Sequence, residues 1–455
     1  MQLMPAIEVL PVEKVFVPGK DATVTYNPRT SLSLESKLST YLQRSGEIMT
    51  IIGPTKVGKS VLVEKVATRR VWLEGSWIKS IDDFWSRLAS ALRIPNSQGR
   101  SNEQVELYKW NVLGNLGFFQ PSVGKDESRS EESSWSQTLP LDQAVSAVLK
   151  WQVELGDPCA IVIDDFHFMD TKTRVEVVRA LKALVRQAVP AVLITLQHYR
   201  AVAARGVQDI GGRTKTLPVP AWELEDLETI ARQGFEALNL FDPFGRIGRR
   251  LAAESYQSPA LMQTLCLQLC DDPANGITET QETLTQVNEP ADWDAFFRGV
   301  EDDLAMDWLA RLAQGPPVRG TKRQHATLTD GRALDGYQQV LLGLNLLGPK
   351  LKTGVAELTD ALRPILDEGE TVDPRILAKL RKMTEIAATS LDEELDAVDE
   401  DDEEESDVEV HRRRELQPVF EFDEDSAEQT IYLVDPFLSY ALRWHGEHAG
   451  VQRPA

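Results

Sequence analysis

The sequence predicts an α/β fold, in which a doubly wound parallel sheet with a phosphate-binding loop precedes a helical lid, a mostly helical region and a C-terminal winged helix. Three observations support the sheet. Residues 53–60 match the P-loop pattern G-x-x-x-x-G-K-[ST] at every specified position. Strand-like and helix-like segments alternate over residues 46–221. An apolar strand ends in the acid pair Asp164-Asp165, so both motifs fall at strand ends, where such sheets bind ligands.

The glycine-rich loop lies between a predicted strand and a predicted helix. Residues 48–52 form an apolar, largely β-branched run, and residues 61–67 have helical apolar spacing. In such a loop, successive backbone N–H groups and the helix N-terminus point at one anion. We expect Lys59 to reach the β- and γ-phosphates of a nucleotide and Ser60 to ligate Mg²⁺. The other residues predicted to bind the nucleotide here are Gly53, Pro54, Thr55, Lys56, Val57, Gly58 and Val61.

The second motif is a pair of carboxylates. Residues 159–163 form an apolar run that stops at Asp164 and Asp165. Two acids at such a position can simply mark a strand leaving the core. About a hundred residues after a P-loop, however, they indicate a metal-binding and catalytic pair. We expect Asp164 to hold the Mg²⁺ and Asp165 to polarise the attacking water as general base.

The remaining elements of the predicted core, residues 46–221, alternate around these motifs. Strands are predicted around residues 71–73, 191–196 and 215–219, and helices over 81–92, 141–154 and 171–187. Residues 96–140 are polar and partly Ser-rich, which indicates a surface insertion. An N-terminal segment, residues 1–45, leads into the core through a helix that carries Leu34, Leu38 and Leu42 on one face.

Helices dominate after the core. Residues 222–330 are predicted to form a helical lid and connector, with one amphipathic helix from Leu224 and another that begins at Ser258-Pro259. Residues 331–445 then carry three helices, over 336–347, 353–366 and 374–388, and two strands, at 419–422 and 430–434. Three helices followed by a hairpin are the outline of a winged helix.

The third of these helices has a basic face, formed by Arg375, Lys379, Arg381 and Lys382. In a winged helix this is the element that reads the major groove of duplex DNA. A basic face is also common on a solvated helix that contacts only protein. Both interpretations fit the sequence.

The composition is that of an ordinary globular chain, with 42% apolar and 26% charged residues over 455 positions. No run of about 18 apolar residues exists to span a membrane, and the N-terminus lacks the pattern of a secretory signal. The three cysteines, Cys159, Cys266 and Cys270, fit small packed side chains rather than a metal site or a disulfide. We therefore expect a cytoplasmic protein.

The net charge of −22 is unevenly distributed. Thirteen Asp or Glu residues and no base lie between Asp392 and Glu409, so the rest of the chain carries −22 + 13 = −9. This tract is too charged and too poor in aromatic residues to fold alone, which predicts a disordered insertion over residues 390–412. The alternative is an electrostatic gate that competes with phosphate for a nearby basic surface.

The loop, the acid pair and the C-terminal outline together resemble a branch of AAA+-related ATPases, the branch of STAND signalling ATPases and origin-recognition-type initiators. The resemblance covers about residues 20–270 and, more loosely, 330–445. It implies that Tyr26 and Arg29 belong to a linker that contacts adenine, and that Pro259 packs on the base.

The same resemblance implies two further kinds of site residue. Thr195 and Gln197 occupy the place of a polar sensor for the γ-phosphate. Arg213 occupies the place of an arginine finger that acts on a neighbouring subunit, with Arg200 and Arg205 as competitors for that role.

We therefore expect an ATP-binding and slowly hydrolysing switch that couples nucleotide state to oligomerisation and to the winged helix, as in a regulator or a defence sensor. Its expected partners are ATP with Mg²⁺, further copies of itself, and a separate effector or partner protein. The alternative is a DNA-binding helper ATPase of the initiator or transposition type, which would bind duplex DNA through the winged helix. A third possibility is a scaffold that binds nucleotide without turnover.

Overall fold

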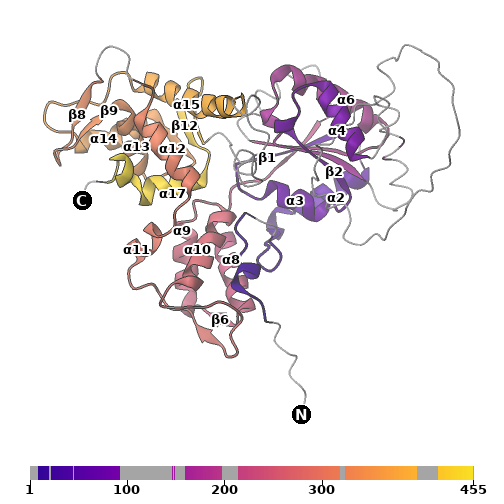
Figure 1. The fold of residues 1–455 in the computed structure, drawn as a ribbon, viewed down its shortest axis with the longest axis horizontal. Helices are drawn as coiled ribbons and strands as arrows, with labels where there is room; N and C mark the ends of the chain where they lie inside the picture. The colour runs from indigo at the N-terminus through magenta and orange to yellow at the C-terminus, as the bar shows by residue number, and fades with distance from the viewer. Residues whose placement is uncertain are drawn as a thin grey trace. The chain divides into compact units, whose positions relative to one another are not determined.

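The computed structural model describes residues 9–19, 22–44, 46–92, 159–196, 214–317, 323–396 and 419–453, together with residues 146 and 148 (Figure 1). They divide into two compact units. The sheet unit comprises residues 28–53 and 59–220, and the helical unit comprises residues 1–27, 54–58 and 221–455. The boundary passes through the P-loop, because its middle five residues have their contacts in the helical unit.

The sheet unit contains a five-stranded parallel sheet in the order β2-β3-β4-β1-β5. Its strands are β1 (Ile48–Gly53), β2 (Arg70–Glu74), β3 (Ala160–Asp164), β4 (Ala191–Leu196) and β5 (Thr214–Pro218). Every residue of β3 and β4 is buried, as expected for central strands that are covered on both faces. The predicted α/β fold class is therefore confirmed.

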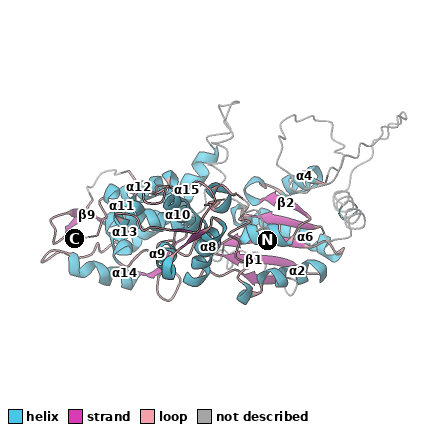
Figure 2. Ribbon diagram, turned by 90° about the horizontal axis from the view of Figure 1, so that it is seen from below, coloured by secondary structure: helices cyan, strands magenta, loops and turns pink. Residues whose placement is uncertain are grey.

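Helices cover both faces of this sheet, with α4 on one side and α2 on the other (Figure 2). The helices are α2 (Leu34–Arg44), α3 (Lys59–Val66), α4 (Ile81–Ala91) and α6 (Thr171–Arg186). α2 packs beside α3, and α4 packs beside α6. Phe84 and Leu88 of α4 meet Val177 and Leu181 of α6 in one buried cluster over the sheet. The apolar spacing along each helix explains this burial, since residues three or four apart share a face.

The helical unit begins with the chain's N-terminal segment, which packs on the lid. The lid helices are α8 (Leu224–Ala237), α9 (Arg246–Ala253) and α10 (Pro259–Asp271), and the short α1 (Val12–Val15) lies against α10. The Val17 N–H and the Thr25 hydroxyl both donate to Oε1 of Gln263, at 2.7 and 3.1 Å. Phe16 fills the space beside Gly234, where a Cβ atom would lie 2.3 Å from its ring.

Further helices and strands complete the helical unit. The helices are α11 (Trp293–Arg298), α12 (Asp303–Gln314), α13 (Gly336–Leu346), α14 (Val355–Leu362), α15 (Ile376–Asp396) and α17 (Pro436–Trp444). The strands are β6 (Leu240–Phe241), β7 (Thr285–Gln286), β8 (His325–Thr327), β9 (Ala333–Asp335), β10 (Lys352–Gly354), β11 (Phe420–Asp423) and β12 (Thr430–Leu433). Short 3-10 turns occur in both units. Those of the sheet unit are Thr30–Leu32, Gly75–Trp77 and Phe166–Phe168, and those of the helical unit are Pro243–Gly245, Arg363–Ile365 and Gly446–Ala449.

Residues 323–453 form what we call the C-terminal domain. Helices α13, α14 and α15 and the β11–β12 hairpin form close to where the sequence predicts them. β10 adds a third strand, so that the antiparallel sheet has the order β10-β12-β11. Leu341, Leu380, Leu438 and Leu442 belong to the core under this sheet.

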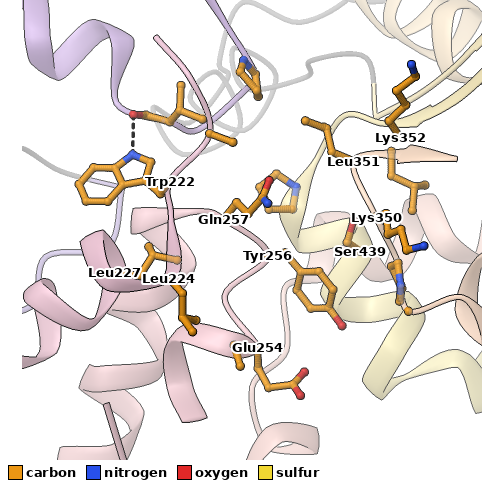
Figure 3. Close-up of a pocket in the computed structure, with 18 of the residues that line it drawn as sticks. Trp222, Leu224, Leu227, Glu254, Tyr256, Gln257, Lys350, Leu351, Lys352 and Ser439 are labelled. Atoms are coloured by element: carbon orange, nitrogen blue, oxygen red, sulfur yellow. Dashed lines mark hydrogen bonds between the residues drawn. The ribbon is translucent and has the colours of Figure 1, made fainter. Parts of the chain in front are cut away.

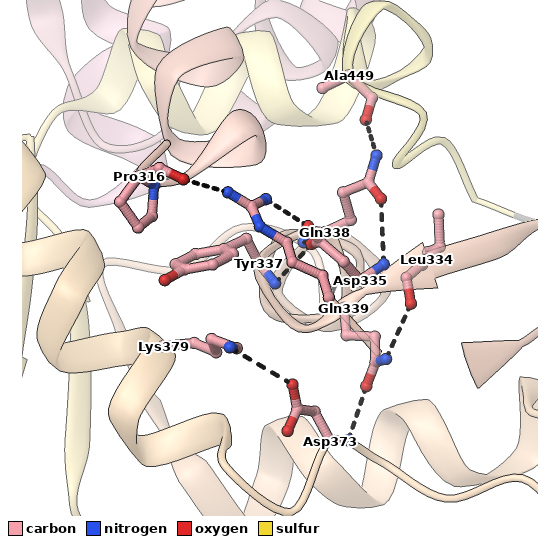
Figure 4. Close-up of polar contacts among 10 residues, drawn as sticks. Pro316, Leu334, Asp335, Tyr337, Gln338, Gln339, Asp373, Lys379 and Ala449 are labelled. Atoms are coloured by element: carbon pink, nitrogen blue, oxygen red, sulfur yellow. Dashed lines mark hydrogen bonds and ion pairs between the residues drawn. The ribbon is translucent and has the colours of Figure 1, made fainter. Parts of the chain in front are cut away.

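A polar network fixes the start of α13 (Figure 4). Asp335 accepts from the N–H groups of Tyr337 and Gln338, and the Gln338 side chain accepts from the Asp335 N–H in return. Gln339 then links the Leu334 carbonyl to the N–H of Asp373. Such a capping box satisfies backbone donors that the first turn of a helix leaves open, which explains the sharp start of α13 after β9.

Several predicted features lie outside the described residues. They are the helix over 141–154 apart from two of its residues, the insertion over 96–140, and most of the acidic tract. No helix in the described part of the chain is long and apolar enough to cross a membrane.

Candidate functional site

The P-loop of the sheet unit begins at a glycine that the packing requires. A Cβ atom on Gly53 would lie 2.2 Å from the carbonyl oxygen of Val219, so no larger residue fits there. The loop ends where α3 begins at Lys59, whose ammonium group is buried and donates to the Gly53 carbonyl at 3.2 Å. Burial lowers the pKa of Lys59 to about 8, although Asp164 and Asp165 oppose that shift. The fold therefore keeps a desolvated cation under the loop.

Ser60 and Asp164 meet directly, although they come from different elements. The Ser60 hydroxyl in the first turn of α3 donates to Oδ2 of Asp164, at the end of β3, at 2.6 Å. Oδ1 of Asp164 accepts from the Asp165 N–H at 2.9 Å. Burial raises the pKa of Asp164, whereas these two hydrogen bonds lower it.

This pair fits the predicted Mg²⁺ site. Mg²⁺ prefers oxygen ligands and commonly takes only one or two from the protein, with phosphates and waters completing its shell. A hydroxyl and a carboxylate that already lie in contact can supply that share. Within the described residues there is no group of three or more His, Cys, Asp or Glu side chains that could hold a metal alone. The geometry thus suits a metal ion that arrives with a phosphate substrate.

Asp165 differs from its neighbour in backbone and in exposure. Its φ of 47° is left-handed, a conformation that is costly for a residue with a side chain. Gly75 makes room for it, because a Cβ atom there would lie 2.4 Å from the Asp165 carbonyl oxygen. The Asp165 side chain is 24% exposed, whereas Asp164 is buried. One carboxylate of the pair is therefore accessible to water, and the other is not.

The sequence did not single out His167, which follows the acid pair. Its Nδ1 atom lies 4.0 Å from Oδ1 of Asp165. Burial lowers the pKa of His167 to about 3, so the ring is neutral at physiological pH. The only sequence signal was its place two residues after Asp165.

Thr195 lies at the end of β4, in register with Ile52 of β1. Its side chain is almost fully buried, and among the described residues nothing hydrogen-bonds to its hydroxyl. A buried polar atom without a partner is uncommon and often marks a functional position. This geometry is compatible with the predicted γ-phosphate sensor. Gln197 and Arg213, with Arg200 and Arg205, lie outside the described residues, and their roles stay predictions.

The middle of the loop, residues 54–58, belongs to the helical unit. Lys56 and Gly58 have φ values of 56° and 86°, which shows how sharply the loop turns. The Lys56 ammonium lies 3.0 Å from Oδ2 of Asp435 and 4.2 Å from the centre of the Phe437 ring. The Trp222 indole N–H donates to the Val57 carbonyl at 3.0 Å.

A cavity of about 730 Å³ opens beside this part of the loop (Figure 3). Thr55 and Val57 contribute to its wall, as do Trp222 and Leu227 at the start of the lid. Figure 3 shows Tyr256 and Gln257 at the middle of the cavity and Lys350, Lys352 and Ser439 at its far side. Its volume lies within the range of small-molecule sites, about 300–1,000 Å³.

The residues predicted to contact the base are placed differently. Tyr26, Arg29 and Pro259 do not line the cavity. Arg29 is buried in the sheet unit and donates to the Pro220 carbonyl at 2.8 Å. Pro259 begins α10 and does not reach the cavity. Tyr256 and Gln257, which come just before Ser258, line the cavity instead. Val61 lies in the first turn of α3 and is half-buried.

The sheet unit thus combines a parallel sheet, a P-loop and a pair of acidic residues at the end of a strand. The sheet unit has an α/β fold that carries a P-loop. No model of a known protein family matches the chain, and no curated protein does.

Several solved structures resemble the chain. Cdc6p from Pyrobaculum aerophilum is 10% identical, with 97% of this chain and 99% of that chain covered and a TM-score of 0.36. ORC2 from Aeropyrum pernix, in ADPNP and ADP complexes, is 11% identical, with 94% and 98% covered and a TM-score of 0.39. A STAND protein from Pyrococcus horikoshii is 15% identical, with 83% and 46% covered and a TM-score of 0.33. At such TM-scores these likenesses carry no argument about the activity of this chain.

The burial of Lys59 leads to a prediction about stability. Replacing it with Met keeps an apolar stem and removes the desolvated charge, so Lys59→Met is expected to raise the free energy of unfolding of the nucleotide-free protein by about 1–3 kcal/mol. Chemical unfolding without nucleotide measures the change. Lys65→Met, at an exposed position of the same helix, is the control and should shift stability by no more than about 0.5 kcal/mol. A Lys59→Met protein less stable than the wild type would contradict this interpretation.

Proposed function

We propose that this chain is an ATP-binding and ATP-hydrolysing switch whose nucleotide state is transmitted to the C-terminal domain. The observation that carries the proposal is the contact between Ser60 and Asp164, with the buried Lys59 beside it. It joins a phosphate-binding loop to a carboxylate at the end of another strand. A lysine that neutralises phosphate charge, and a hydroxyl and a carboxylate that bind Mg²⁺, are the groups that bind a nucleoside triphosphate with its metal.

The proposed binding mode uses the loop in the usual way of its class. The backbone N–H groups of the loop and the start of α3 face the phosphates, and Lys59 neutralises charge on the β- and γ-phosphates. Ser60 and Asp164 would hold Mg²⁺, directly or through water, and the bound ion would supply further charge neutralisation. In the helical unit, the cavity beside residues 54–58 is lined by the loop itself and by Tyr256.

For hydrolysis, Asp165 is the proposed general base. Its partial exposure lets it contact a water molecule, and its left-handed backbone is accommodated because residue 75 is a glycine. Asp165 would orient this water and accept its proton as the water attacks the γ-phosphate. His167 is neutral, so it adds no positive charge beside the Asp165 carboxylate. We expect a slow reaction that an arginine from a neighbouring copy accelerates, with Arg213 as the candidate.

We further infer that the C-terminal domain is a winged helix. Its element order, α13-β10-α14-α15-β11-β12, and its sheet order, β10-β12-β11, support this assignment. The basic face of α15 is largely neutralised within the domain. Nε of Arg381 donates to Glu424 at 2.7 Å, and Lys382 pairs with Glu385 at 2.7 Å.

Lys379 also has an acidic neighbour, with its ammonium 4.0 Å from Asp373 (Figure 4). These carboxylates cancel much of the positive charge that phosphate contacts with duplex DNA need. The pairing favours a protein partner over DNA for this domain. A regulator or defence sensor that acts through a separate effector protein is the biological role we propose.

The first test of this proposal concerns turnover. Asp165→Asn should still bind ATP but lose hydrolysis by about 10²–10⁴-fold, because the general base is gone. A phosphate-release assay and a fluorescent nucleotide titration measure the two properties. Asp170→Asn is the matched control, since the Asp170 side chain caps α6 and accepts from the Thr173 hydroxyl, and Asn is an equally good cap residue. A wild-type protein that binds no ATP, or an Asp165→Asn protein with unchanged turnover, would overturn the proposed role.

A second test separates the protein-partner role from the DNA-helper role. Duplex DNA at low salt should leave the ATPase rate of the wild type unchanged, because α15 carries little free positive charge. The rate per chain should instead rise with protein concentration if a neighbouring copy supplies the arginine. A rate that DNA stimulates strongly, and that falls steeply as salt increases, would favour the DNA-binding helper.

A further inference from the structure

The cavity beside residues 54–58 lies wholly within the helical unit, because every residue that lines it belongs to that unit. Trp222, Leu224 and Leu227, at the start of the lid, give it an apolar side (Figure 3). Leu224 is 42% exposed, so apolar surface is left for a ligand to cover. The cavity therefore has the mixed lining, mostly apolar with a few polar groups, that small-molecule sites share.

The charged residues that line this cavity carry both signs. Glu223, Lys350 and Lys352 are exposed, whereas Glu254 and Arg443 are half-buried. Lys350 also pairs with a glutamate of α14 at 2.7 Å. The two less exposed charges are thus one carboxylate and one guanidinium. A purely anionic or purely cationic ligand would meet a like charge here, whereas a ligand that carries both signs could pair with each.

The two half-buried charges lie near each other but are not bonded. Oε2 of Glu254 accepts from the Trp444 indole N–H at 3.0 Å, and the Arg443 guanidinium lies 5.1 Å from the centre of the Trp444 ring. In the described part of the chain they form no ion pair with each other. Burial raises the pKa of the Tyr256 phenol, and Glu254 raises it further whereas Arg443 lowers it, so both charges act on one side chain of the cavity. Arg453, which also lowers that pKa, donates to a backbone carbonyl of α13 at 2.8 Å and does not line the cavity.

Two further residues of the lining have costly backbone conformations. Tyr256 and Gln257, between α9 and α10, have φ values of 45° and 61°, both left-handed. Ser255 fixes this turn, because its hydroxyl donates to the Leu251 carbonyl at 2.7 Å and its carbonyl accepts from the Ser258 N–H at 2.9 Å. Strain that the surrounding structure enforces in this way is concentrated at ligand sites.

We propose that this cavity binds a free amino acid with an apolar side chain. Such a ligand carries one ammonium group, one carboxylate and an apolar group. Glu254 would accept from the ammonium group, and Arg443 would bind the carboxylate through paired N–H donors. Leu224 and Leu227 would cover the ligand's side chain. The inference does not depend on the proposed ATP site, whose buried lysine and metal-binding residues do not line this cavity.

The test is calorimetric titration of the full chain, without nucleotide, with L-leucine, L-phenylalanine and two leucine analogues that each lack one charge. Leucinamide has the ammonium group but no carboxylate, and 4-methylpentanoate has the carboxylate but no ammonium group. Leucine should bind about 10–100-fold more tightly than either analogue, as expected for the loss of hydrogen bonds between charged groups. Analogues that bind as tightly as leucine, or a chain that binds neither amino acid, would overturn the proposal.

Two variants assign each charge to its partner on the ligand. Glu254→Gln keeps an acceptor for the Trp444 indole and should weaken the binding of leucine and leucinamide but not of 4-methylpentanoate. Arg443→Met should weaken the binding of leucine and 4-methylpentanoate but not of leucinamide. Arg363→Met is the control and should change none of the affinities, because Arg363 pairs with Asp360 outside the cavity. If either cavity variant weakens all three ligands equally, its residue supports the cavity's structure and the proposed contact is wrong.

Discussion

The contact between Ser60 and Asp164 is the interaction on which the rest of the site depends. β1, which leads into the loop, and β3, which ends in the acid pair, are not neighbours, because β4 lies between them in the sheet. The hydrogen bond of 2.6 Å spans that separation and ties the first turn of α3 to the end of β3. It can form only because the parallel strands bring their carboxyl ends to one edge. The sheet order is therefore a condition of the chemistry as well as of the packing.

The same edge concentrates features that cost stability. Lys59 is a buried cation, Asp164 is a buried carboxylate, and Asp165 has a left-handed backbone that Gly75 accommodates. The Thr195 hydroxyl is buried with no hydrogen-bond partner among the described residues. Protein interiors rarely keep such groups together unless a ligand or a reaction uses them. A nucleoside triphosphate with its metal would give the Thr195 hydroxyl a hydrogen-bond partner and would offset the buried charges of Lys59 and Asp164.

Much of the sheet unit could be predicted from the sequence, because its signals are local. β1, β3 and β4 are apolar runs that end at recognisable residues, and the predicted boundaries agree to within a residue or two. The short strands β8, β9 and β10 were missed, since three residues are too few to show a period of two. The predicted helix over 353–366 begins instead as β10, because Thr353 pairs with Ile431 of a hairpin far along the chain. Contacts of that kind leave no local pattern.

The candidate site, too, could be predicted from the sequence only in part. Ser60 and Asp164 were predicted to hold the same metal ion, and the structure places them in hydrogen-bond contact, whereas the wall of the cavity was not predicted. Asp435 carries no motif, and only tertiary packing brings it to Lys56. His167 and Gln257 lay beside predicted residues, which was the only sequence signal they offered. The roles of Tyr26, Arg29 and Pro259 stay predictions, as do those of Arg200, Arg205 and Arg213.

The measurement that tests the central claim most directly is the binding of ATP with and without Mg²⁺, by calorimetry, to the wild type and to Ser60→Ala. The wild type should bind ATP more tightly when Mg²⁺ is present, because Ser60 and Asp164 share the ion with the phosphates. Ser60→Ala should bind ATP with an affinity that Mg²⁺ no longer improves. Equal Mg²⁺ dependence in the two proteins, or no ATP binding by the wild type, would contradict the account.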